Sequence, residues 1–292
     1  MIEVPATFRA MPRWWSEGTD WVEALPRLVA DQCERWRLAP DGPVRHGSNA
    51  LVVPVRRGAE RLALRMSPPG DDVAREAATL RFWDGRGTVR LVDADPTRRA
   101  QLLEWIDPGT SLETVPLLQT PAILGAVLRR LAIPAPPDTP DTGRVTAADA
   151  AGWLRRWQAL GAPAHQRHLA TALAAAAAVR EPATPDLAVN ADLHFGQILR
   201  ARREPWLVVD PVLLRGDIDY DLGRLLWSRL DELADDGAVR GYLAAVVEAA
   251  QLDLERAERL VLVRAMSYLL WGLERGLTED PPRCRRLLEV FG

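Results

Sequence analysis

Two aspartates and a glutamine in the second half of the chain have the residue types and spacing that phosphoryl transfer requires. Asp192 follows the apolar run 187–189, Asp210 follows the apolar run 207–209, and Gln197 lies five residues after Asp192. One aspartate can accept the proton of an acceptor hydroxyl, while a second carboxylate and an amide supply the hard oxygen ligands that Mg²⁺ prefers. Taken alone, each aspartate could equally be a turn cap, because an isolated D-x-x-x-x-Q pattern has little specificity.

The apolar runs before these aspartates predict short strands that end in loops, where a rigid support presents catalytic groups. Strand-like runs over 187–190, 198–199 and 206–210 form a β-rich segment in a half of the chain that is otherwise helical. Four prolines within 134–142 exclude a helix there and predict a connector. Apolar residues recur at helical spacing over 123–133, 147–160, 169–179, 239–250, 254–273 and 283–290.

The N-terminal third has a different texture, with one helix followed by strand-like runs. Apolar residues from Trp21 to Trp36 lie on one stripe at helical spacing, which predicts an amphipathic helix that restarts at Pro26. We therefore predict an α+β fold with two lobes: a small β-meander lobe with one helix, and a larger helical lobe that carries the catalytic loop. The strand-like runs of the small lobe lie at 51–55, 62–64, 89–92 and 100–105, with the helix at 71–83.

Composition restricts the class of protein further. The 292 residues are 48% hydrophobic and 26% charged, as in folded globular proteins. The net charge of −3 provides no basic surface field, so we expect no nucleic-acid partner. Cys33 and Cys284 lack the spacing of a zinc or disulfide framework, and no apolar stretch has the length of a membrane span. We expect a cytoplasmic protein without a membrane partner. Lysine is absent, so all 37 basic residues are arginines.

Three consecutive segments carry a resemblance to a known family. Residues 190–197 read N-A-D-L-H-F-G-Q, residues 209–211 read V-D-P, and residues 216–222 read G-D-I-D-Y-D-L. In order and spacing they resemble the H-G-D-x-x-x-x-N, I-D-P and G-D-x-x-x-D-L segments of the aminoglycoside phosphotransferase family, most of all its streptomycin 6-phosphotransferase and hydroxyurea phosphotransferase branch. The resemblance implies a protein-kinase-like fold and transfer of the γ-phosphate of ATP or GTP, with Mg²⁺, to a small-molecule hydroxyl.

The resemblance also implies roles for individual residues. Asp192 corresponds to the catalytic base, and Asp210 and Gln197 correspond to the metal ligands. Arg65 occupies the position of the phosphate-binding lysine, and Glu76, on the next helix, is its expected ion-pair partner. The other implied residues are Ser48 in the turn over the phosphates, Glu104 and Ile106 at the adenine, and Asn190, Asp217 and Asp221 as supports of the loop.

The same resemblance implies a division of the chain. We expect an N-terminal helical extension over 1–38, a small nucleotide-binding lobe over 39–104, a hinge over 105–110 and a helical lobe with the acceptor site over 111–292. A monomer or weak homodimer is expected. Candidate acids that face the acceptor are Asp231, Glu232, Asp235, Asp236, Glu274, Glu279 and Asp280.

Three positions depart from the family pattern, and they leave two hypotheses open. Asn190 replaces the histidine, Gln197 replaces the asparagine and Arg65 replaces the lysine. In the first hypothesis the protein is an active kinase for an aminoglycoside such as streptomycin, hydroxyurea or a related metabolite. In the second it is a degenerate kinase fold that binds a nucleotide or metabolite without phosphoryl transfer. Asp192 and Asp210 favour the first hypothesis, whereas the three substitutions favour the second.

Overall fold

The computed structural model describes residues 2–11, 14, 18–47, 50–107 and 109–292. The chain divides into two compact units, residues 1–107 and residues 108–292. The N-terminal unit contains an antiparallel sheet, and the larger C-terminal unit is mainly helical. This mixed architecture confirms the predicted α+β fold class. No helix among the described residues is long and apolar enough to cross a membrane.

An antiparallel sheet forms the centre of the N-terminal unit. Its strands lie in the order β1-β3-β4-β6-β5, and β2 also pairs with β3. In the β3–β4 hairpin Leu51 pairs with Met66, and Gly58 in the connecting turn has a φ of +62°, a conformation that glycine adopts without steric cost. The strands are β1 (Ala39–Pro40), β2 (Arg45–His46), β3 (Leu51–Arg57), β4 (Glu60–Met66), β5 (Leu91–Asp95) and β6 (Ala100–Glu104).

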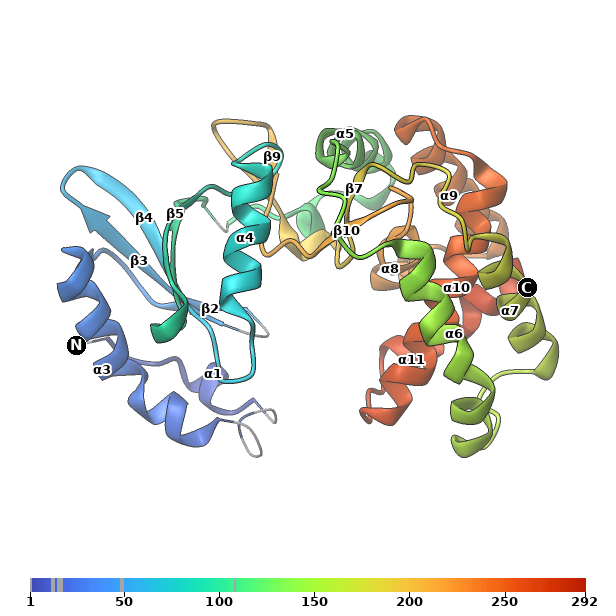
Figure 1. The fold of residues 1–292 in the computed structure, drawn as a ribbon, viewed down its shortest axis with the longest axis horizontal. Coiled ribbons are helices and arrows are strands. Elements are labelled where there is room, and N and C mark those ends of the chain that lie inside the picture. The colour runs from blue at the N-terminus through green and yellow to red at the C-terminus, as the bar shows by residue number, and fades with distance from the viewer. Residues whose placement is uncertain (1, 12–13, 15–17, 48–49, 108) are drawn as a thin grey trace. The chain divides into compact units, whose positions relative to one another are not determined.

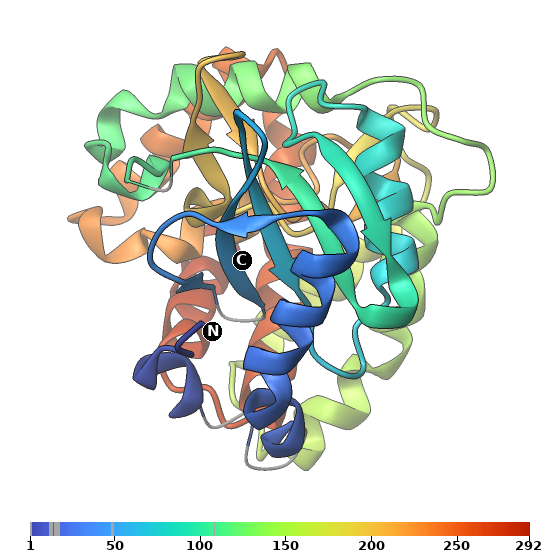
Figure 2. The same ribbon diagram turned by 90° about the vertical axis from the view of Figure 1, so that its left-hand side faces the viewer.

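Two helices, α3 (Thr19–Trp36) and α4 (Val73–Trp83), lie on opposite sides of this sheet (Figure 1). In Figure 2 the blue helix α3 crosses in front of the strands. Leu62, Leu64 and Met66 of β4 join one buried apolar cluster with α3 and the short helix α1 (Ala6–Arg9). Because successive strand residues point to opposite faces, Arg65 lies on the other face, on the side of α4.

Helix α3 is continuous from Thr19 to Trp36, so the predicted restart at Pro26 is wrong. An interior proline removes one helical hydrogen bond and costs about 3 kcal/mol. Trp21, Leu25 and Val29 are all buried on the sheet side of this helix, and full burial of one such side chain contributes roughly 1.5–3 kcal/mol. Packing against the sheet therefore outweighs the local cost of the proline.

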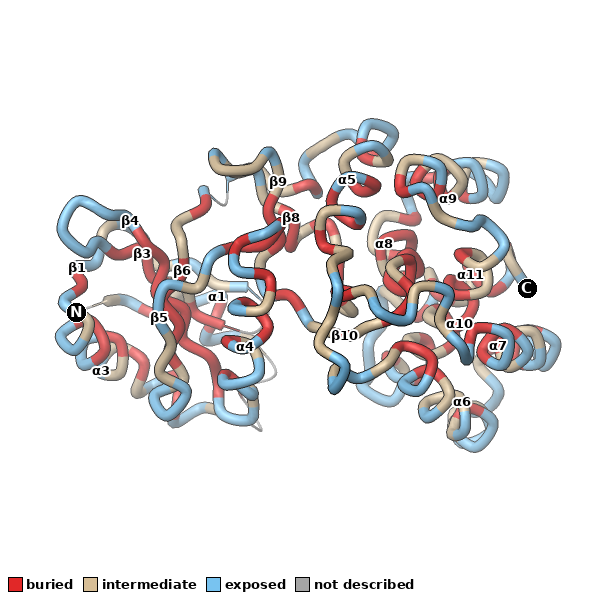
Figure 3. Tube along the Cα trace, turned by 45° about the horizontal axis from the view of Figure 1, so that its top comes forward, coloured by how far each residue is buried: buried red, intermediate tan, exposed pale blue. Residues whose placement is uncertain are grey.

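The C-terminal unit is built around helix α10 (Leu254–Glu274), which packs against α6, α7, α8 and α11. Buried residues follow α10 and its neighbours in Figure 3. The remaining helices of this unit are α5 (Pro121–Leu131), α6 (Thr142–Ala159), α7 (Gln166–Ala178), α8 (Leu222–Ser228), α9 (Asp236–Ala250) and α11 (Asp280–Phe291). Single 3-10 turns lie at Leu112–Thr114, Leu117–Gln119, Phe195–Gln197 and Leu230–Glu232, and one more, Pro96–Arg98, joins β5 to β6 in the other unit.

Two small antiparallel ladders account for the β-rich segment of the helical unit. Strand β7 (Ala188–Asn190) pairs with β10 (Leu213–Arg215), and β8 (Ile198–Arg200) pairs with β9 (Trp206–Val208). One loop, residues 191–197, connects β7 to β8, and a second, residues 209–212, connects β9 to β10. These two loops carry Asp192 and Asp210. The proline-rich segment before α6 is not helical and is tied to the first ladder by the bridges Pro134–Leu187 and Asp141–Arg215.

Candidate active site

The loop after β7 is anchored by the side chain of Asn190. Its Oδ1 accepts hydrogen bonds from the backbone N–H of Asp192 at 3.2 Å and from that of Val212 at 2.9 Å. The second bond joins the loop to the start of β10, the partner strand of β7. Asparagine at this position therefore holds the turn that presents Asp192, although its own Nδ2 has no partner among the described residues.

Asp192 has two side-chain partners within the C-terminal unit. Its Oδ1 forms an ion pair with Nη1 of Arg224, which lies on α8. Its Oδ2 accepts a hydrogen bond of 3.4 Å from Nε2 of Gln197. The Asp192 side chain is 35% exposed and that of Arg224 is 22% exposed, so this pair lies at the edge of the core. Nothing in the spacing of the sequence pointed to Arg224.

Asp210 and Gln197 lie at the same end of the β8–β9 ladder. The backbone N–H of Val209 donates to the carbonyl of Gln197 at 2.8 Å, and Nε2 of Gln197 donates to the carbonyl of Asp210 at 3.4 Å. Asp210 is exposed and has a φ of +56°, immediately before Pro211. Strained backbone of this kind, which aspartate tolerates better than most residues, concentrates at functional sites.

The oxygen donors at this position fit a Mg²⁺ ion. Gln197 is 7% exposed, and its Oε1 is buried without a hydrogen-bond partner among the described residues. A buried amide oxygen without a donor is costly unless a ligand satisfies it. Together with the exposed Asp210 carboxylate, it offers the kind of oxygen ligands that Mg²⁺ prefers. The longer glutamine side chain is thus compatible with a metal ligand at this position.

Asp221 supports the loop 191–197 through hydrogen bonds of its buried carboxylate. Its Oδ2 accepts a hydrogen bond of 2.7 Å from the backbone N–H of Leu193, and its Oδ1 accepts one of 3.1 Å from Arg264 on α10. Arg264 also stacks over the ring of Tyr220, 4.5 Å from its centroid. Burial raises the pKa of Asp221 to about 6, and Arg264 and the Leu193 N–H oppose that shift. The carboxylate therefore links the loop to α10 through its ion pair with Arg264.

Asp217 has its partners outside the loop 191–197. Its carboxylate accepts hydrogen bonds from Arg256 at 2.6 and 2.9 Å and from the backbone N–H of Ala183 at 2.7 Å. Its own N–H donates to Oγ1 of Thr142 at 3.2 Å. Gly216 before it has a φ of +128°, and a Cβ at this position would lie 2.1 Å from that oxygen. Asp217 therefore joins the starts of α6 and α10.

The nucleotide-binding residues predicted from the sequence lie in the N-terminal unit. Arg65 is 6% exposed, and its Nη1 donates to Glu76 at 2.5 Å, Ser67 at 2.6 Å and Gln101 at 2.8 Å. Strand β4 and helix α4 thus bring Arg65 and Glu76 together. Because Arg65 pairs with Gln101 across β4 and β6, the guanidinium is held between the sheet and α4.

Strand β6 ends at the residues expected near the adenine. The backbone N–H of Glu104 donates to Arg90 at 2.9 Å, and its Oε2 accepts from the N–H of Arg90 at 2.9 Å. Glu104 is therefore engaged in closing the edge of the sheet, and Ile106 two residues later is 9% exposed. Ser48 lies outside the described residues.

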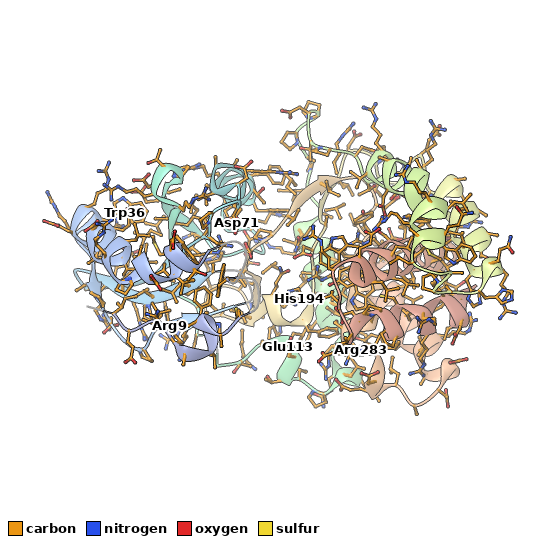
Figure 4. All side chains as sticks on the ribbon, turned by 90° about the horizontal axis from the view of Figure 1, so that it is seen from below. Arg9, Trp36, Asp71, Glu113, His194 and Arg283 are labelled. Carbon is orange, nitrogen blue, oxygen red and sulfur yellow. The ribbon has the colours of Figure 1, made fainter. Side chains whose placement is uncertain are left out.

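His194, between Asp192 and Gln197, is surrounded by acids. A Cβ on Gly196 would lie 2.8 Å from Oε1 of Glu113 and 3.3 Å from the His194 ring, so these two side chains flank the same turn (Figure 4). Burial lowers the pKa of His194, and the negative charges of Glu113, Asp210 and Asp280 oppose that effect. The net lowering of the His194 pKa favours the neutral form of the imidazole.

Most acids proposed to face the acceptor have structural partners. Asp231 pairs with Arg283 at 2.6 Å, Glu232 with Arg229 at 2.6 Å and Glu274 with Arg156 at 2.9 Å. Asp235 caps α9 by accepting from Ala238 N at 2.8 Å. Asp280 pairs with Arg283 at 3.4 Å and also acts electrostatically on His194 and Arg224. Burial, together with the charge of Asp280, raises the pKa of Tyr268 to about 12.

The fold resembles solved small-molecule kinases. The aminoglycoside phosphotransferase APH(4)-Ia superposes with a TM-score of 0.63 over 91% of this chain and 99% of that chain, at 16% identity. The choline kinase LicA from Streptococcus pneumoniae gives a TM-score of 0.60 over 91% of this chain and 98% of its own, at 10% identity. These similarities establish the protein-kinase-like fold class that the motifs predicted.

Closer relatives establish the family. The streptomycin 6-kinase of Streptomyces griseus is 36% identical over 91% of this chain and 89% of its own length. The hydroxyurea phosphotransferase of Kitasatospora aureofaciens is 34% identical over 100% of this chain and 86% of its own. The sequence profile of the aminoglycoside/hydroxyurea antibiotic resistance kinases matches residues 35–276. The chain belongs to this family, which confirms the resemblance drawn from the three motifs.

Proposed function

We propose that this protein phosphorylates a hydroxyl of a small antibiotic or of hydroxyurea, with ATP as the phosphoryl donor. The proposal rests on one observation: an aspartate at the end of β7 and an aspartate with an amide oxygen at the end of the β8–β9 ladder lie in two hydrogen-bonded loops. Relatives named for phosphorylating streptomycin and hydroxyurea support the acceptor class.

In this proposal Asp192 receives the proton of the acceptor hydroxyl as its oxygen attacks the γ-phosphorus. The bond between that phosphorus and the β–γ bridging oxygen breaks, and ADP leaves. Asp210 and Gln197 would hold Mg²⁺, which neutralises charge on the transferring phosphoryl group when bound. Asn190 and Asp221 would hold the loop through direct hydrogen bonds, and Asp217 would hold the starts of α6 and α10. In this scheme, charge neutralisation and positioning stabilise the transition state, and no covalent enzyme intermediate forms.

The N-terminal unit would supply the nucleotide contacts. Arg65 carries a permanent charge and can donate to phosphate oxygens, as the family's lysine does, while Glu76 keeps it oriented. Glu104 and Ile106 would contribute backbone groups to the adenine, and Ser48 would lie at the phosphates. Because the backbone N–H of Glu104 donates to the carbonyl of Arg90, Glu104 would contact the adenine ring through its own carbonyl oxygen.

Release of ADP is the direct test of this function. The purified protein is given MgATP or MgGTP with streptomycin, other aminoglycosides, hydroxyurea or a simple sugar. Turnover is expected with an acceptor of the first three kinds. Asp192→Asn should remove it, whereas Asp138→Asn, in the exposed connector before α6, serves as the matched control. Absence of turnover with every acceptor in a protein that binds nucleotide would contradict the proposal.

The second candidate function is nucleotide or metabolite binding without transfer. It is favoured by the arginine at position 65, whose Nη1 already bonds to three acceptors in its own unit. Melting temperatures with and without MgATP separate the possibilities. A nucleotide-dependent rise that Asp210→Ala removes, without turnover of any acceptor, would favour this binding role, and a rise with turnover would favour the kinase.

A further inference from the structure

The carboxylate proposed as the catalytic base is engaged by the chain itself. Oδ1 of Asp192 is paired with Arg224, and Oδ2 accepts from Gln197 at 3.4 Å. A base must lie within about 2.6–3.2 Å of the hydroxyl whose proton it takes. An acceptor hydroxyl that approaches Oδ1 competes with the Arg224 guanidinium for that oxygen.

The support of the loop rests on other residues. Asn190 fixes the turn through Asp192 N and Val212 N, and Asp221 holds Leu193 N and Arg264. These bonds involve backbone groups or the buried side chains of Asn190 and Asp221, whereas the Arg224–Asp192 pair joins two side chains at the edge of the core. The pair can therefore open without loss of the bonds that hold the loop.

A second carboxylate, Asp280 of α11, which pairs with Arg283 at 3.4 Å, belongs to a helix that packs against α8. Burial and the positive charge of Arg264 lower the pKa of Arg224, whereas Tyr268 and Asp280 oppose that shift. Asp280 begins α11. Tyr268 stacks on Trp227 with ring centroids 4.6 Å apart, and it contacts the 41% exposed Trp271 in a tilted arrangement at 5.0 Å. Arg224 thus pairs with Asp192 and lies within electrostatic range of Tyr268 and Asp280, where α8 packs against α11.

We propose that Arg224 is a positioning residue that occupies Asp192 in the acceptor-free protein and moves toward Asp280 when the acceptor hydroxyl takes its place on Oδ1. The inference rests on the proposed phosphoryl transfer. Its consequence is control of the same site: while Arg224 is bound to Asp192, a water molecule has poor access to the base, and ATP is protected from hydrolysis until an acceptor is present.

The decisive experiment measures ADP release without acceptor for the wild type, Arg224→Gln, Arg224→Lys and the double variant Asp192→Asn with Arg224→Gln. A hydrogen bond to a charged group contributes about 1.5–3 kcal/mol, so Arg224→Gln should raise this hydrolysis about tenfold. Arg224→Lys should lie between it and the wild type, and the double variant should lose the gain. A merely structural role of Arg224 would lower the rate instead.

Arg156→Gln is the matched control. Arg156 pairs with Asp149 at 2.8 Å, with side chains 19% and 32% exposed, close to the 22% and 35% of Arg224 and Asp192. Its acceptor-free hydrolysis should equal that of the wild type. Hydrolysis by folded Arg224→Gln at or below the wild-type rate would overturn the proposal.

Two further measurements test the two halves of the movement. The melting temperatures of Asp192→Asn, Arg224→Gln and their combination should be non-additive by about 3 °C if the pair exists, and additivity overturns it even if no acceptor is turned over. Asp280→Asn should raise the acceptor KM in the wild type and leave it unchanged in Arg224→Gln. An equal effect in both backgrounds excludes Asp280 as the receiving group. Absence of acceptor turnover in the wild type contradicts the proposed function alone.

Discussion

The two units hold arginine–carboxylate pairs of opposite character. Arg65 in the N-terminal unit is 6% exposed and donates to Glu76, Ser67 and Gln101. The pair of Asp192 and Arg224 in the C-terminal unit lies at the edge of the core, next to Gln197, whose Oε1 has no hydrogen-bond partner in the described part of the chain. The first network is closed and depends on strand register and a neighbouring helix. The second is open and has capacity for new partners. The Arg65 network can therefore hold its charge in one place, whereas the Asp192–Arg224 pair can exchange partners.

The largest expected effect is on the open side. Asp192→Asn should lower kcat for the acceptor by roughly 10²–10⁴-fold, since an amide cannot take the hydroxyl proton. Its melting temperature should fall only by the few degrees that the ion pair with Arg224 contributes, because Asn190 and Asp221 hold the loop independently. ADP release at saturating MgATP and acceptor measures the loss. Retention of more than a tenth of wild-type kcat would place the base elsewhere.

On the closed side, Arg65→Met should destabilise the N-terminal unit. Removing one partner of a buried ion pair costs about 3–5 kcal/mol, because Glu76 and Gln101 lose their donor. Urea unfolding followed by tryptophan fluorescence measures it. Arg57→Met, an exposed pair with Glu60 on the same hairpin, should cost less than about 0.5 kcal/mol. Equal costs would show that the Arg65 network is no more closed than a surface pair.

Asp219 is a buried carboxyl whose burial is only partly compensated, by a backbone hydrogen bond and the charge of Arg256. Burial and the charge of Asp217 raise its pKa to about 7. A carboxyl with a raised folded-state pKa contributes stability at pH values below its unfolded pKa of about 3.9. This contribution is lost as the pH rises through 7. Asp219→Asn should therefore be more stable than the wild type at pH 8.5, on the order of 2–4 kcal/mol, with a smaller difference at pH 5.

Melting curves at the two pH values measure this difference. The exposed Asp186 provides the control, since Asp186→Asn should show no such pH dependence. A stability gain for Asp219→Asn that is the same at pH 5 and pH 8.5 would contradict the titration of this buried carboxyl.

The smallest effect is expected at Gln197. Shortening it by one methylene in Gln197→Asn withdraws Oε1 from its present place and should weaken the Mg²⁺ dependence of turnover by about tenfold. Steady-state rates across a Mg²⁺ titration at fixed ATP give the apparent affinity. A higher apparent Mg²⁺ affinity in the variant would show that asparagine, as in the family pattern, is the better metal ligand and that Gln197 weakens Mg²⁺ binding.

Much of this organisation follows from local sequence. Strand-like runs that end in Asp192 and Asp210, and a helix at 71–83 after the strand with Arg65, are short-range patterns, and the structure has strands and a helix at these places. The restart of α3 at Pro26 was wrong because a long-range contact, the burial of Trp21, Leu25 and Val29 on the sheet, overrides a local preference.

The sequence by itself determined the family, the two-lobed α+β class and the order of the acidic motifs, because these depend on residue identity and on spacing along the chain. Only the tertiary structure decided that Arg224 pairs with Asp192. That contact requires α8 to pack closely on α10, where a Cβ at Gly223 would lie 2.8 Å from that of Arg264. Residues 32 positions apart meet because helices pack through surfaces that no local pattern encodes.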